Sequence, residues 1–303
     1  MNTINFFRFI RSKNSLLTVV IPASSYGHNG VRYLSDLLLS ISIQKTPVRI
    51  VVSDHSRDYA IKRYLDDADK ANVFYFRNRR GRGNWCHNAN YAIRIARFGR
   101  SPLIKIMFQD DIFVDPEALE KIITAFNSEP DKGWLCHASS HFLDPGVPID
   151  FNRKLALTET RKILVPKFTP RLLLLENDIS CPSAITFKKN YKVEFDKNIL
   201  WGGDCDFYWA LSLHFGEPII LETNLTANRE HNFSITHRFQ TDNSPSKKRF
   251  IDGRKVRNSK DLLVWEIEYM DRKYKYRLPV IQTFPIRIVR LMRLIKYKFF
   301  VVS

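Results

Sequence analysis

The sequence predicts an α/β protein whose central sheet is mostly parallel and flanked by helices. Short apolar, β-branched runs alternate along the chain with segments whose apolar residues repeat at helical spacing, which is the order of βαβ units. Acidic or polar residues come directly after several of these runs, where open α/β sheets bind their ligands. With 303 residues, the chain can bury a substantial core.

The first half of the chain predicts four strands, each followed by a helix. The first run stops at Pro22, because proline cannot donate to a sheet ladder. The predicted strands cover residues 16–22, 48–53, 73–76 and 103–107, and the helices after them cover 31–41, 58–69, 85–98 and 117–126. This regular alternation favours parallel strands joined by crossover helices.

The second half is less regular. Residues 139–170 contain four prolines and little periodicity, and so long an irregular insertion in a compact domain is often a substrate loop. Residues 241–260 are polar and basic, which is typical of a linker or exposed loop. The elements predicted here are strands over 133–137, 179–187 and 218–221, a helix after the Gly-Gly turn at 202–203, and a helical pattern over 261–276.

Two adjacent carboxylates, Asp110 and Asp111, follow the fourth predicted strand. Paired aspartates there suit a hard divalent cation, Mg²⁺ or Mn²⁺, which would hold a diphosphate. The alternative is a solvated acidic turn that caps the next helix. His231 and His237 are candidates for a third metal ligand, although a lone histidine is usually structural.

The ends of the second and third predicted strands are also polar. Asp54 ends the second strand, where a carboxylate can accept hydrogen bonds from a ribose or a base edge, or can cap the next helix instead. The loop over 77–84 carries four arginines that could pair with phosphate oxygens, with Arg82 between two glycines. It matches neither a Walker A loop nor a complete dinucleotide motif, and a solvated basic loop is the alternative.

A second informative stretch covers residues 200–211. Asp204 begins the helix there, where it is either a general base or an N-cap. Trp201 and Trp209 offer flat apolar faces for sugar rings, although core packing is the commoner use of tryptophan.

Charge and cysteine usage narrow the class of protein. The net charge of +17 favours an anionic partner: nucleic acid, an acidic membrane face or a phosphorylated substrate. No helix-turn-helix, zinc-finger or RNP signature is present and the bases are spread over the chain, which argues against a nucleic-acid-binding protein. The spacing of the four cysteines indicates neither a zinc cluster nor a disulfide framework and favours a reducing compartment.

The C-terminal end has a composition of its own. Residues 286–302 mix large apolar residues with arginine and lysine at helical spacing, as in helices that lie on anionic membranes. The alternative is a terminal helix docked on the core. We therefore predict a basic, aromatic segment at 1–15, a main domain at 16–240 and a basic helical extension at 241–303, in a cytoplasmic protein held peripherally at the inner face of the membrane.

Taken together, these residues resemble the inverting glycosyltransferases of family 2, which have the GT-A fold. The resemblance covers about residues 16–240. Its elements, in order, are the Val-Val-Ile-Pro run at 19–22, Asp54 after the second strand, the Gly/Asn-rich helix entry at 83–90, the acidic end of the fourth strand, and Gly203-Asp204 at a helix start.

The sequence departs from the family pattern at three places. Many relatives have Asp-Gln-Asp-Asp-Ile at the metal-binding strand, and Phe108 replaces the first aspartate here. The later motif is usually Glu-Asp, and Gly203 replaces the glutamate while Asp204 keeps the position of the base. The Q/R-x-x-R-W continuation of processive synthases is absent, which favours addition of one sugar or few.

The resemblance implies a role for each candidate residue. Asp204 would be the catalytic base, and Trp201 and Asp206 would contact the acceptor. The nucleotide sugar would be bound by Pro22, Asp54, Arg82, Asn88 and Asp110, and a divalent metal, Mn²⁺ or Mg²⁺, by Asp110, Asp111 and His231.

The implied activity is transfer of one sugar from a nucleotide-diphosphate donor to a hydroxyl of a glycan or lipid-linked acceptor, in bacterial surface polysaccharide synthesis. The main alternative is a GT-A protein that binds a nucleotide sugar without catalysis. A nucleic-acid-binding protein is the more distant alternative.

Overall fold

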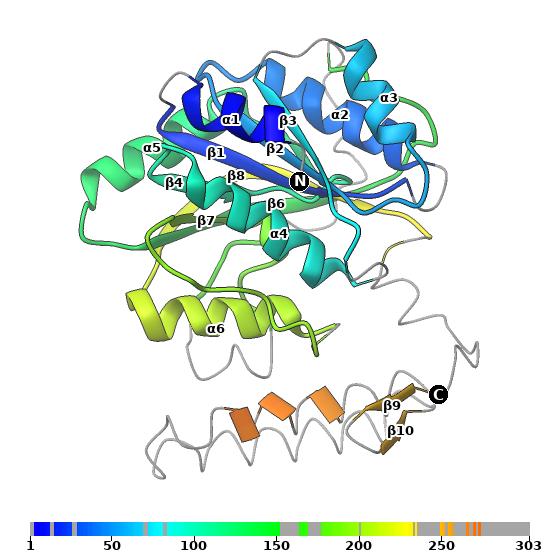
Figure 1. Cartoon of the computed structure of the whole chain (residues 1–303). Helices are drawn as coiled ribbons and strands as arrows, with labels where there is room; N and C mark the ends of the chain where they lie inside the picture. The colour runs from blue at the N-terminus through cyan, green and yellow to red at the C-terminus, as the bar shows by residue number, and fades with distance from the viewer. Residues whose placement is uncertain are drawn as a thin grey trace, which may run out of the picture.

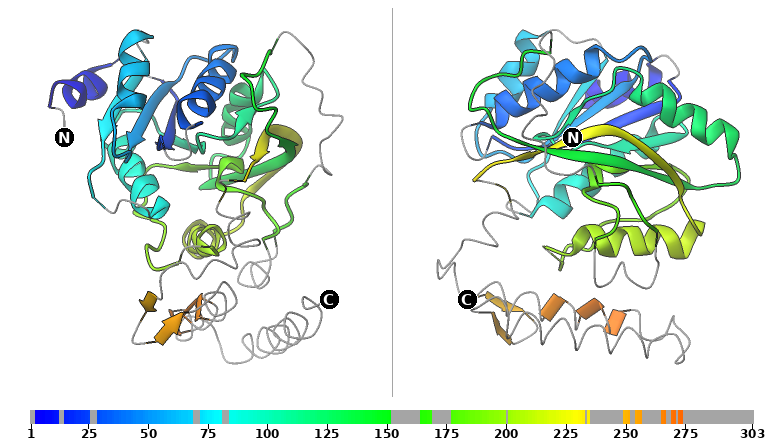
Figure 2. Two further views of the ribbon diagram at one scale, coloured as in Figure 1. Left: turned by 90° about the vertical axis from the view of Figure 1, so that its right-hand side faces the viewer. Right: turned by 180° about the vertical axis from the view of Figure 1, so that it is seen from behind.

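The computed structural model describes most of the chain up to residue 234 and short pieces beyond it. An 8-stranded sheet lies at its centre with helices on both faces, which confirms the predicted α/β architecture (Figures 1 and 2). The described residues are 3–12, 15–25, 29–68, 72–80, 84–151, 164–168, 177–199, 201–232, 234, 249–251, 254–256, 265–266, 269–270 and 272–273.

The predicted alternation of strands and helices holds through the first half of the chain. The helices are α1 (Thr3–Arg11), α2 (Gly30–Ser42), α3 (Ala60–Asp67), α4 (Trp85–Phe98), α5 (Ala118–Ser128) and α6 (Gly203–Phe215). The strands are β1 (Leu17–Ala23), β2 (Arg49–Asp54), β3 (Val73–Arg77), β4 (Leu103–Ile106), β5 (Ile112–Phe113), β6 (Trp134–Leu143), β7 (Ile185–Lys188), β8 (Ile219–Glu230), β9 (Arg249–Ile251) and β10 (Arg254–Val256).

The large sheet has the strand order β3-β2-β1-β4-β7-β6-β8-β5. The pairs β1–β2, β2–β3, β1–β4 and β6–β8 are parallel, whereas β7 is antiparallel to both β4 and β6 and β5 is antiparallel to β8. The strands β1 to β4 therefore end at the same edge of the sheet. The predicted polar residues that follow them are brought together there.

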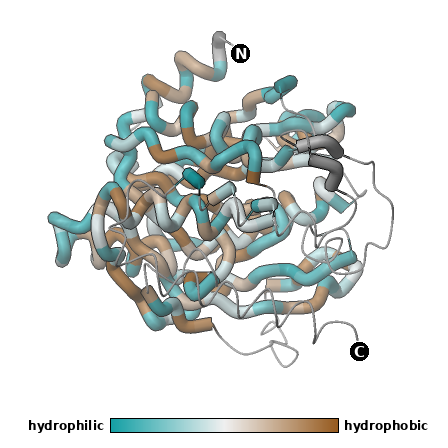
Figure 3. The backbone as a smooth tube through the Cα atoms, turned by 90° about the horizontal axis from the view of Figure 1, so that it is seen from below, coloured by the Kyte–Doolittle hydropathy of each residue, from teal (hydrophilic) through white to brown (hydrophobic). Residues whose placement is uncertain are grey.

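Strands such as β1 contribute to two hydrophobic cores because their side chains alternate between the two faces of the sheet. Leu17, Val19 and Ile21 of β1 pack with α2, α3 and α5, while Val20 packs with α4 and α6 on the other face. Figure 1 shows α6 on the opposite side of the sheet from α2 and α3. In Figure 3, hydrophobic and hydrophilic stretches alternate within single helices, as expected of helices with one packed face.

The N-terminal segment predicted at residues 1–15 contains a helix that packs against the domain. Phe9 of α1 is fully buried, with its ring centroid 5.1 Å from that of Phe74. A Cβ on Gly99 would lie 2.6 Å from the Phe9 ring, so the end of α4 approaches α1 only because residue 99 has no side chain.

Two strands are longer than the sequence predicts. β6 continues to Leu143, into the stretch predicted as irregular, and β8 runs on to Glu230 beside it. Their common part is rich in serine, histidine and asparagine, and several of these side chains are buried. Ser139 is one of them, and its Oγ lies 2.6 Å from the Oγ of Ser180 in the segment before β7. A search for apolar runs misses such strands, as it misses β5, which has two residues.

Less of the C-terminal part is described. β9 and β10 form an antiparallel hairpin inside the segment predicted as a linker. Trp265 and Met270, from the predicted helical pattern at 261–276, are buried. The predicted amphipathic helix at 286–302 lies outside the described residues, and within them no helix is long and apolar enough to cross a membrane.

Candidate functional site

The carboxylate of Asp110 lies beside the imidazole of His231, with 3.0 Å between Oδ2 and Nε2. Asp110 belongs to the turn after β4, and His231 directly follows β8, so the sheet joins two residues that are 121 positions apart. The Asp110 side chain is 29% exposed and that of His231 10%. Tyr33 of α2 packs on His231, with 4.9 Å between the ring centroids. Two of the three predicted metal ligands are thus neighbours at the surface.

Asp111 is held differently from Asp110. Its side chain is buried, its Oδ2 accepts a hydrogen bond of 2.5 Å from Ser183 Oγ, and Cys181 Sγ lies 3.5 Å from the same oxygen. Burial, followed by the charge of Asp110, raises the pKa of Asp111 to about 7. The Ser183 hydroxyl also accepts a hydrogen bond from the Phe108 amide, so it fixes the acidic turn at two points. The predicted metal contact of Asp111 stays a prediction.

The Asp110–His231 pair fits a cation that takes most of its ligands from elsewhere. No group of three or more His, Cys, Asp or Glu side chains that could hold a metal occurs in the described part of the chain. Mg²⁺ is commonly bound through one or two carboxylates, with substrate phosphates and water as the remaining ligands. Asp110 can supply such a carboxylate and His231 a nitrogen. His237, the other candidate, lies outside the described residues.

Asp54 is fully buried at the end of β2, and both of its oxygens are hydrogen bonded. Oδ1 accepts from the amide of Ser56 at 2.8 Å and from its hydroxyl. Oδ2 accepts from Tyr75 Oη at 2.7 Å and from Arg77 Nη1 at 3.1 Å. The carboxylate therefore joins the ends of β2 and β3 to the loop between them. A contact of Asp54 with the nucleoside stays a prediction.

Asn88 of α4 joins the ends of β1 and β2. It is buried, and its Nδ2 donates to the carbonyl oxygens of Ser53 at 2.8 Å and Ala23 at 3.1 Å. Pro22, one residue before Ala23, is buried in β1 and paired in register with Ser53. These two predicted nucleotide-binding residues thus shape the sheet edge, while Arg82 lies outside the described residues.

Gln109 was not among the predicted site residues. Its amide pairs with the main chain of Ser24, with Oε1 2.5 Å from the Ser24 nitrogen and Nε2 2.8 Å from the Ser24 oxygen. This contact joins the turn after β4 to the loop after β1. The only sign of this contact in the sequence is the position of a glutamine next to the acidic pair.

Asp204 lies in the first turn of α6 and is partly exposed. Its Oδ2 accepts a hydrogen bond of 2.6 Å from Asn177 Nδ2, and its Oδ1 accepts one of 2.8 Å from the Cys205 amide. Burial raises the pKa of Asp204 to about 6, against the opposing effect of these hydrogen bonds. A carboxylate with such a pKa is ionised at neutral pH and still basic enough to accept a proton.

Gly203 stands where the family that the sequence resembles usually has a glutamate, and its surroundings leave no room for a side chain. A Cβ on this residue would lie 2.9 Å from Cζ2 of Trp85 at the start of α4. The starts of α4 and α6 therefore approach each other too closely for a side chain at position 203.

The segment from Asn177 to Ser183 touches both candidate carboxylates, Asp204 at its start and Asp111 at its end. Oδ1 of Asn177 accepts from the amides of Ile179 and Ser180 at 3.1 and 3.0 Å, which makes a tight turn. Ser180 has a φ of 88°, which is rare for a residue other than glycine. Such backbone persists only where its surroundings hold it firmly.

The residues predicted to contact the acceptor are held by the C-terminal part of the chain. The amides of Trp201 and Gly202 donate to the buried carboxylate of Glu266 at 3.1 and 2.9 Å. Asp206 is fully buried, and both its oxygens lie 2.8 Å from Lys273 Nζ. Trp209 is part of the core. The contacts of Trp201 and Asp206 with an acceptor stay predictions.

Comparison with known proteins places the fold. No family model and no curated protein matches the chain. Among solved structures, residues 1–349 of S. aureus TarS in complex with UDP-GlcNAc match with a TM-score of 0.54 and 15% identity, over 86% of this chain and 73% of that one. The complex of the same fragment with UDP matches with a TM-score of 0.50 and 13% identity, over 86% and 72%.

A longer TarS chain matches with a TM-score of 0.50 and 14% identity, and it covers 74% of this chain. This chain spans only 38% of that one. The matches show that the fold is the GT-A type of nucleotide-sugar glycosyltransferases, as the sequence motifs predict. At 13–15% identity, the likeness concerns the fold alone.

Proposed function

We propose that this protein is an inverting glycosyltransferase of the family 2 type, which moves one sugar from a nucleotide-diphosphate donor to an acceptor hydroxyl. One observation carries the proposal: Asp204 is a partly exposed carboxylate at a helix start, oriented by Asn177, with a pKa raised to about 6. In a GT-A fold, that is the chemistry expected of a general base. UDP-GlcNAc in the similar TarS fragment supports a nucleotide sugar as donor.

In the proposed reaction, the acceptor hydroxyl approaches Asp204 and gives its proton to the carboxylate as its oxygen attacks the anomeric carbon. The new glycosidic C–O bond forms as the bond to the donor diphosphate breaks on the opposite face, so a single displacement inverts the carbon. Asp110 and His231 would hold Mn²⁺ or Mg²⁺ beside the diphosphate. The cation would supply positive charge to stabilise the leaving group.

The acceptor side of the proposal depends on the rest of the chain. A glycan or lipid-linked acceptor, as in bacterial surface polysaccharide synthesis, is consistent with the net charge of +17 and with the basic C-terminal sequence. We propose that the protein works in the cytoplasm, peripherally at the inner face of the membrane. The missing Q/R-x-x-R-W motif favours addition of one sugar or few.

A screen of nucleotide sugars for hydrolysis in the presence of Mn²⁺ tests the proposal. We expect turnover of one donor class by the wild-type protein, loss of turnover with a chelator, and calorimetric binding of the same donor to Asp204→Asn without turnover. The asparagine keeps the shape of the side chain but cannot take the proton, so transfer should fall by at least about a hundredfold.

The main alternative is a GT-A protein that binds a nucleotide sugar without catalysis. Two observations favour it: Phe108 replaces the first acid of the metal motif, and Asp111 is buried against Ser183. The same screen separates the two functions. Tight donor binding by the wild-type protein with no turnover of any donor, with or without metal and acceptor, would establish the alternative.

A further inference from the structure

Arg229, near the end of β8, is fully buried and every nitrogen of its guanidinium has an acceptor. Nη2 lies 2.8 Å from Oδ2 of Asp36, and Nη1 lies 3.0 Å from Oδ1 of Asp144. Nε donates to the main-chain oxygen of Asp110 at 3.1 Å. The side chain therefore joins helix α2, the end of β6 and the acidic turn after β4.

Two aromatic rings also hold the guanidinium. Its carbon lies 4.6 Å from the ring centroid of Tyr33 and 4.9 Å from that of Phe142. A planar cation with two aromatic rings in contact and an acceptor at each nitrogen has little freedom to rotate or shift. Arg229 is thus fixed in place from several elements at once.

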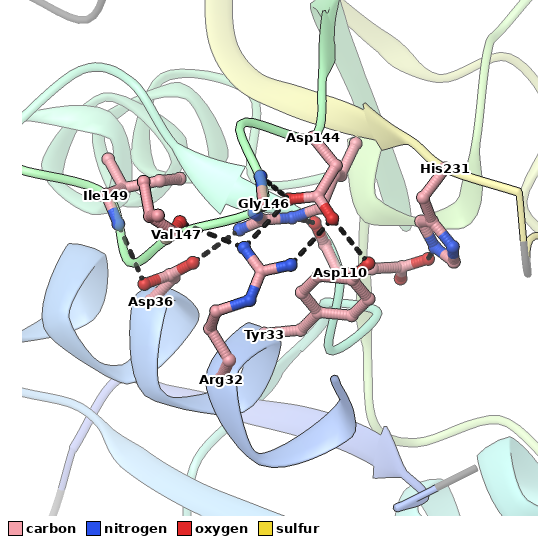
Figure 4. Close-up of polar contacts among 10 residues, drawn as sticks. Arg32, Tyr33, Asp36, Asp110, Asp144, Gly146, Val147, Ile149 and His231 are labelled. Atoms are coloured by element: carbon pink, nitrogen blue, oxygen red, sulfur yellow. Dashed lines mark hydrogen bonds and ion pairs between the residues drawn. The ribbon is translucent and has the colours of Figure 1, made fainter. Parts of the chain in front are cut away.

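The charges around Arg229 are balanced, which explains how the cluster remains buried. Arg32 forms a second, bidentate pair with Asp144, at 2.8 and 2.6 Å, and Tyr33 Oη donates to the same carboxylate at 2.8 Å. Burial disfavours the Asp144 carboxylate, but the hydrogen bonds from Arg32, Tyr33 and Arg229 outweigh it and lower its pKa. Figure 4 shows this cluster lying directly beside Asp110 and His231.

The position of Arg229 in the chain relates it to the proposed metal-binding pair. His231 follows two residues later, and residues spaced by two emerge on the same side of an extended chain. Arg229 therefore binds the main chain of Asp110 while His231 meets its carboxylate. One end of β8 thus determines both where the Asp110 backbone lies and what its side chain touches.

We propose that Arg229 is a positioning residue for Asp110: it fixes the backbone of the acidic turn so that Asp110 and His231 hold the cation at the donor diphosphate. The inference rests on the proposed function for the role of the pair, but its geometric part does not. Arg229 itself contacts neither the donor nor the cation in this scheme. It acts through the Asp110 carbonyl.

Arg229→Lys and Arg32→Lys form a matched pair of variants. Both replace an arginine that binds Asp144, but only Arg229 binds Asp110. Lysine keeps the charge and has a single nitrogen, so it cannot contact Asp36, Asp144 and the Asp110 carbonyl in the same arrangement. Circular dichroism and thermal melting show whether each variant is folded.

Hydrogen exchange of the Asp111 amide, which donates to the Phe108 oxygen, reports on the acidic turn without any ligand. Titration with Mn²⁺, followed by the electron paramagnetic resonance of the free ion, reports on the pair. In Arg229→Lys we expect exchange at Asp111 at least about tenfold faster and Mn²⁺ binding at least about tenfold weaker. In Arg32→Lys both should stay within about twofold of the wild type.

Unchanged exchange and unchanged Mn²⁺ binding in Arg229→Lys would overturn the proposal, as would equal changes in both variants. If the wild-type protein binds neither Mn²⁺ nor a nucleotide sugar while exchange at Asp111 still responds to Arg229→Lys alone, the proposed function fails and the positioning of the turn stands. If Arg229→Lys does not fold, Asp36→Asn replaces it, because it weakens one anchor of the guanidinium. It should accelerate exchange at Asp111, and an unchanged rate would overturn the proposal.

Discussion

Asn177 donates a hydrogen bond of 2.6 Å from Nδ2 to Oδ2 of Asp204, and its own Oδ1 closes the turn that leads to Ser180. One amide therefore orients the proposed base and shapes the segment that continues to Ser183 and Asp111. This contact joins the two halves of the candidate site. Asn177 itself was not among the predicted site residues.

Asn177→Ala should make the proposed base harder to ionise. The amide hydrogen bond favours the charged form of Asp204, so its loss should raise the pKa of Asp204 further and move the acidic limb of the pH–rate profile to higher pH. We expect transfer at pH 6 to fall by about tenfold and transfer at pH 8 to fall less. Asn198→Ala, which removes another amide near the surface, is the control. A fall that is equal at both pH values would contradict the assignment.

Asp204→Asn should stabilise the folded protein at neutral pH while it abolishes transfer. The pKa of Asp204 is raised in the fold from 3.8 to about 6, so the folded state binds the proton more tightly than the unfolded state. The stability that this proton contributes is complete below pH 4, is lost as the pH rises to 6, and amounts to about 3 kcal/mol. Melting curves at pH 4 and pH 8 check this prediction. The melting temperature of the variant should exceed that of the wild type only at pH 8.

Asp110→Ala should abolish sugar transfer, and a metal chelator should abolish the transfer activity of the wild-type protein. Among the residues that the structure describes, no cluster of three or more possible metal ligands occurs, so we expect no other side chain to replace the lost carboxylate. The measurement is transfer against Mn²⁺ concentration, with Asp115→Ala as a control outside the proposed site. Residual activity of Asp110→Ala within about tenfold of the wild type would remove Asp110 from the site.

Glu266→Ala should loosen the start of α6. The buried carboxylate accepts hydrogen bonds from the amides of Trp201 and Gly202, and without it two partly buried donors lose their partner. We expect the free energy of unfolding to fall by about 1–3 kcal/mol. Denaturant titration measures this, with the exposed Glu222→Ala as the control. An unchanged midpoint would show that the C-terminal part does not support α6.

Removal of the residues after Arg277 should release the protein from anionic vesicles and leave nucleotide-sugar hydrolysis largely intact. The removed part contains the basic and apolar residues of 286–302, and each base near an anionic leaflet is worth about 1 kcal/mol. Glu266 and Lys273, which contact the start of α6, are retained. Vesicle sedimentation at moderate salt checks the prediction. Precipitation of the truncated protein would indicate that the terminal helix is docked on the core. If the full-length protein does not bind the vesicles, a membrane role is contradicted.

The sequence predicts the first half of the fold well because its strands are apolar runs and its helices are amphipathic. The predicted helix at 85–98 has the bounds of α4, and Asn84 caps it because its Oδ1 accepts hydrogen bonds from the amides of Cys86 and His87. The sequence predicts β6 and β8 poorly, because these strands contain buried polar residues, some of which have hydrogen-bond partners far along the chain. Ser139 and Ser180, 41 positions apart, are one such pair.

The candidate site shows the same division. Asp110 and Asp204 could be singled out because each is a carboxylate at the end or start of a predicted element, and His231 because it is a histidine near the end of the predicted main domain. Asn177 and Arg229 could not, because an asparagine in a loop and an arginine in a strand carry no local signal of their task. Both act through a second residue, and that relation exists only in the folded chain.

The spacing of Arg229 and His231 defines a short sequence pattern by which other chains with this arrangement could be recognised. A chain that arranges its acidic turn in this way needs an arginine and a histidine with one residue between them, at the end of a strand such as β8. An insertion or deletion of one residue between them would turn one of the two side chains to the other face of the strand, so we expect any chain that positions its acidic turn in this way to keep the spacing. Arg-x-His, sought about 120 residues after an acidic turn, is therefore a query for relatives whose full sequences no longer align.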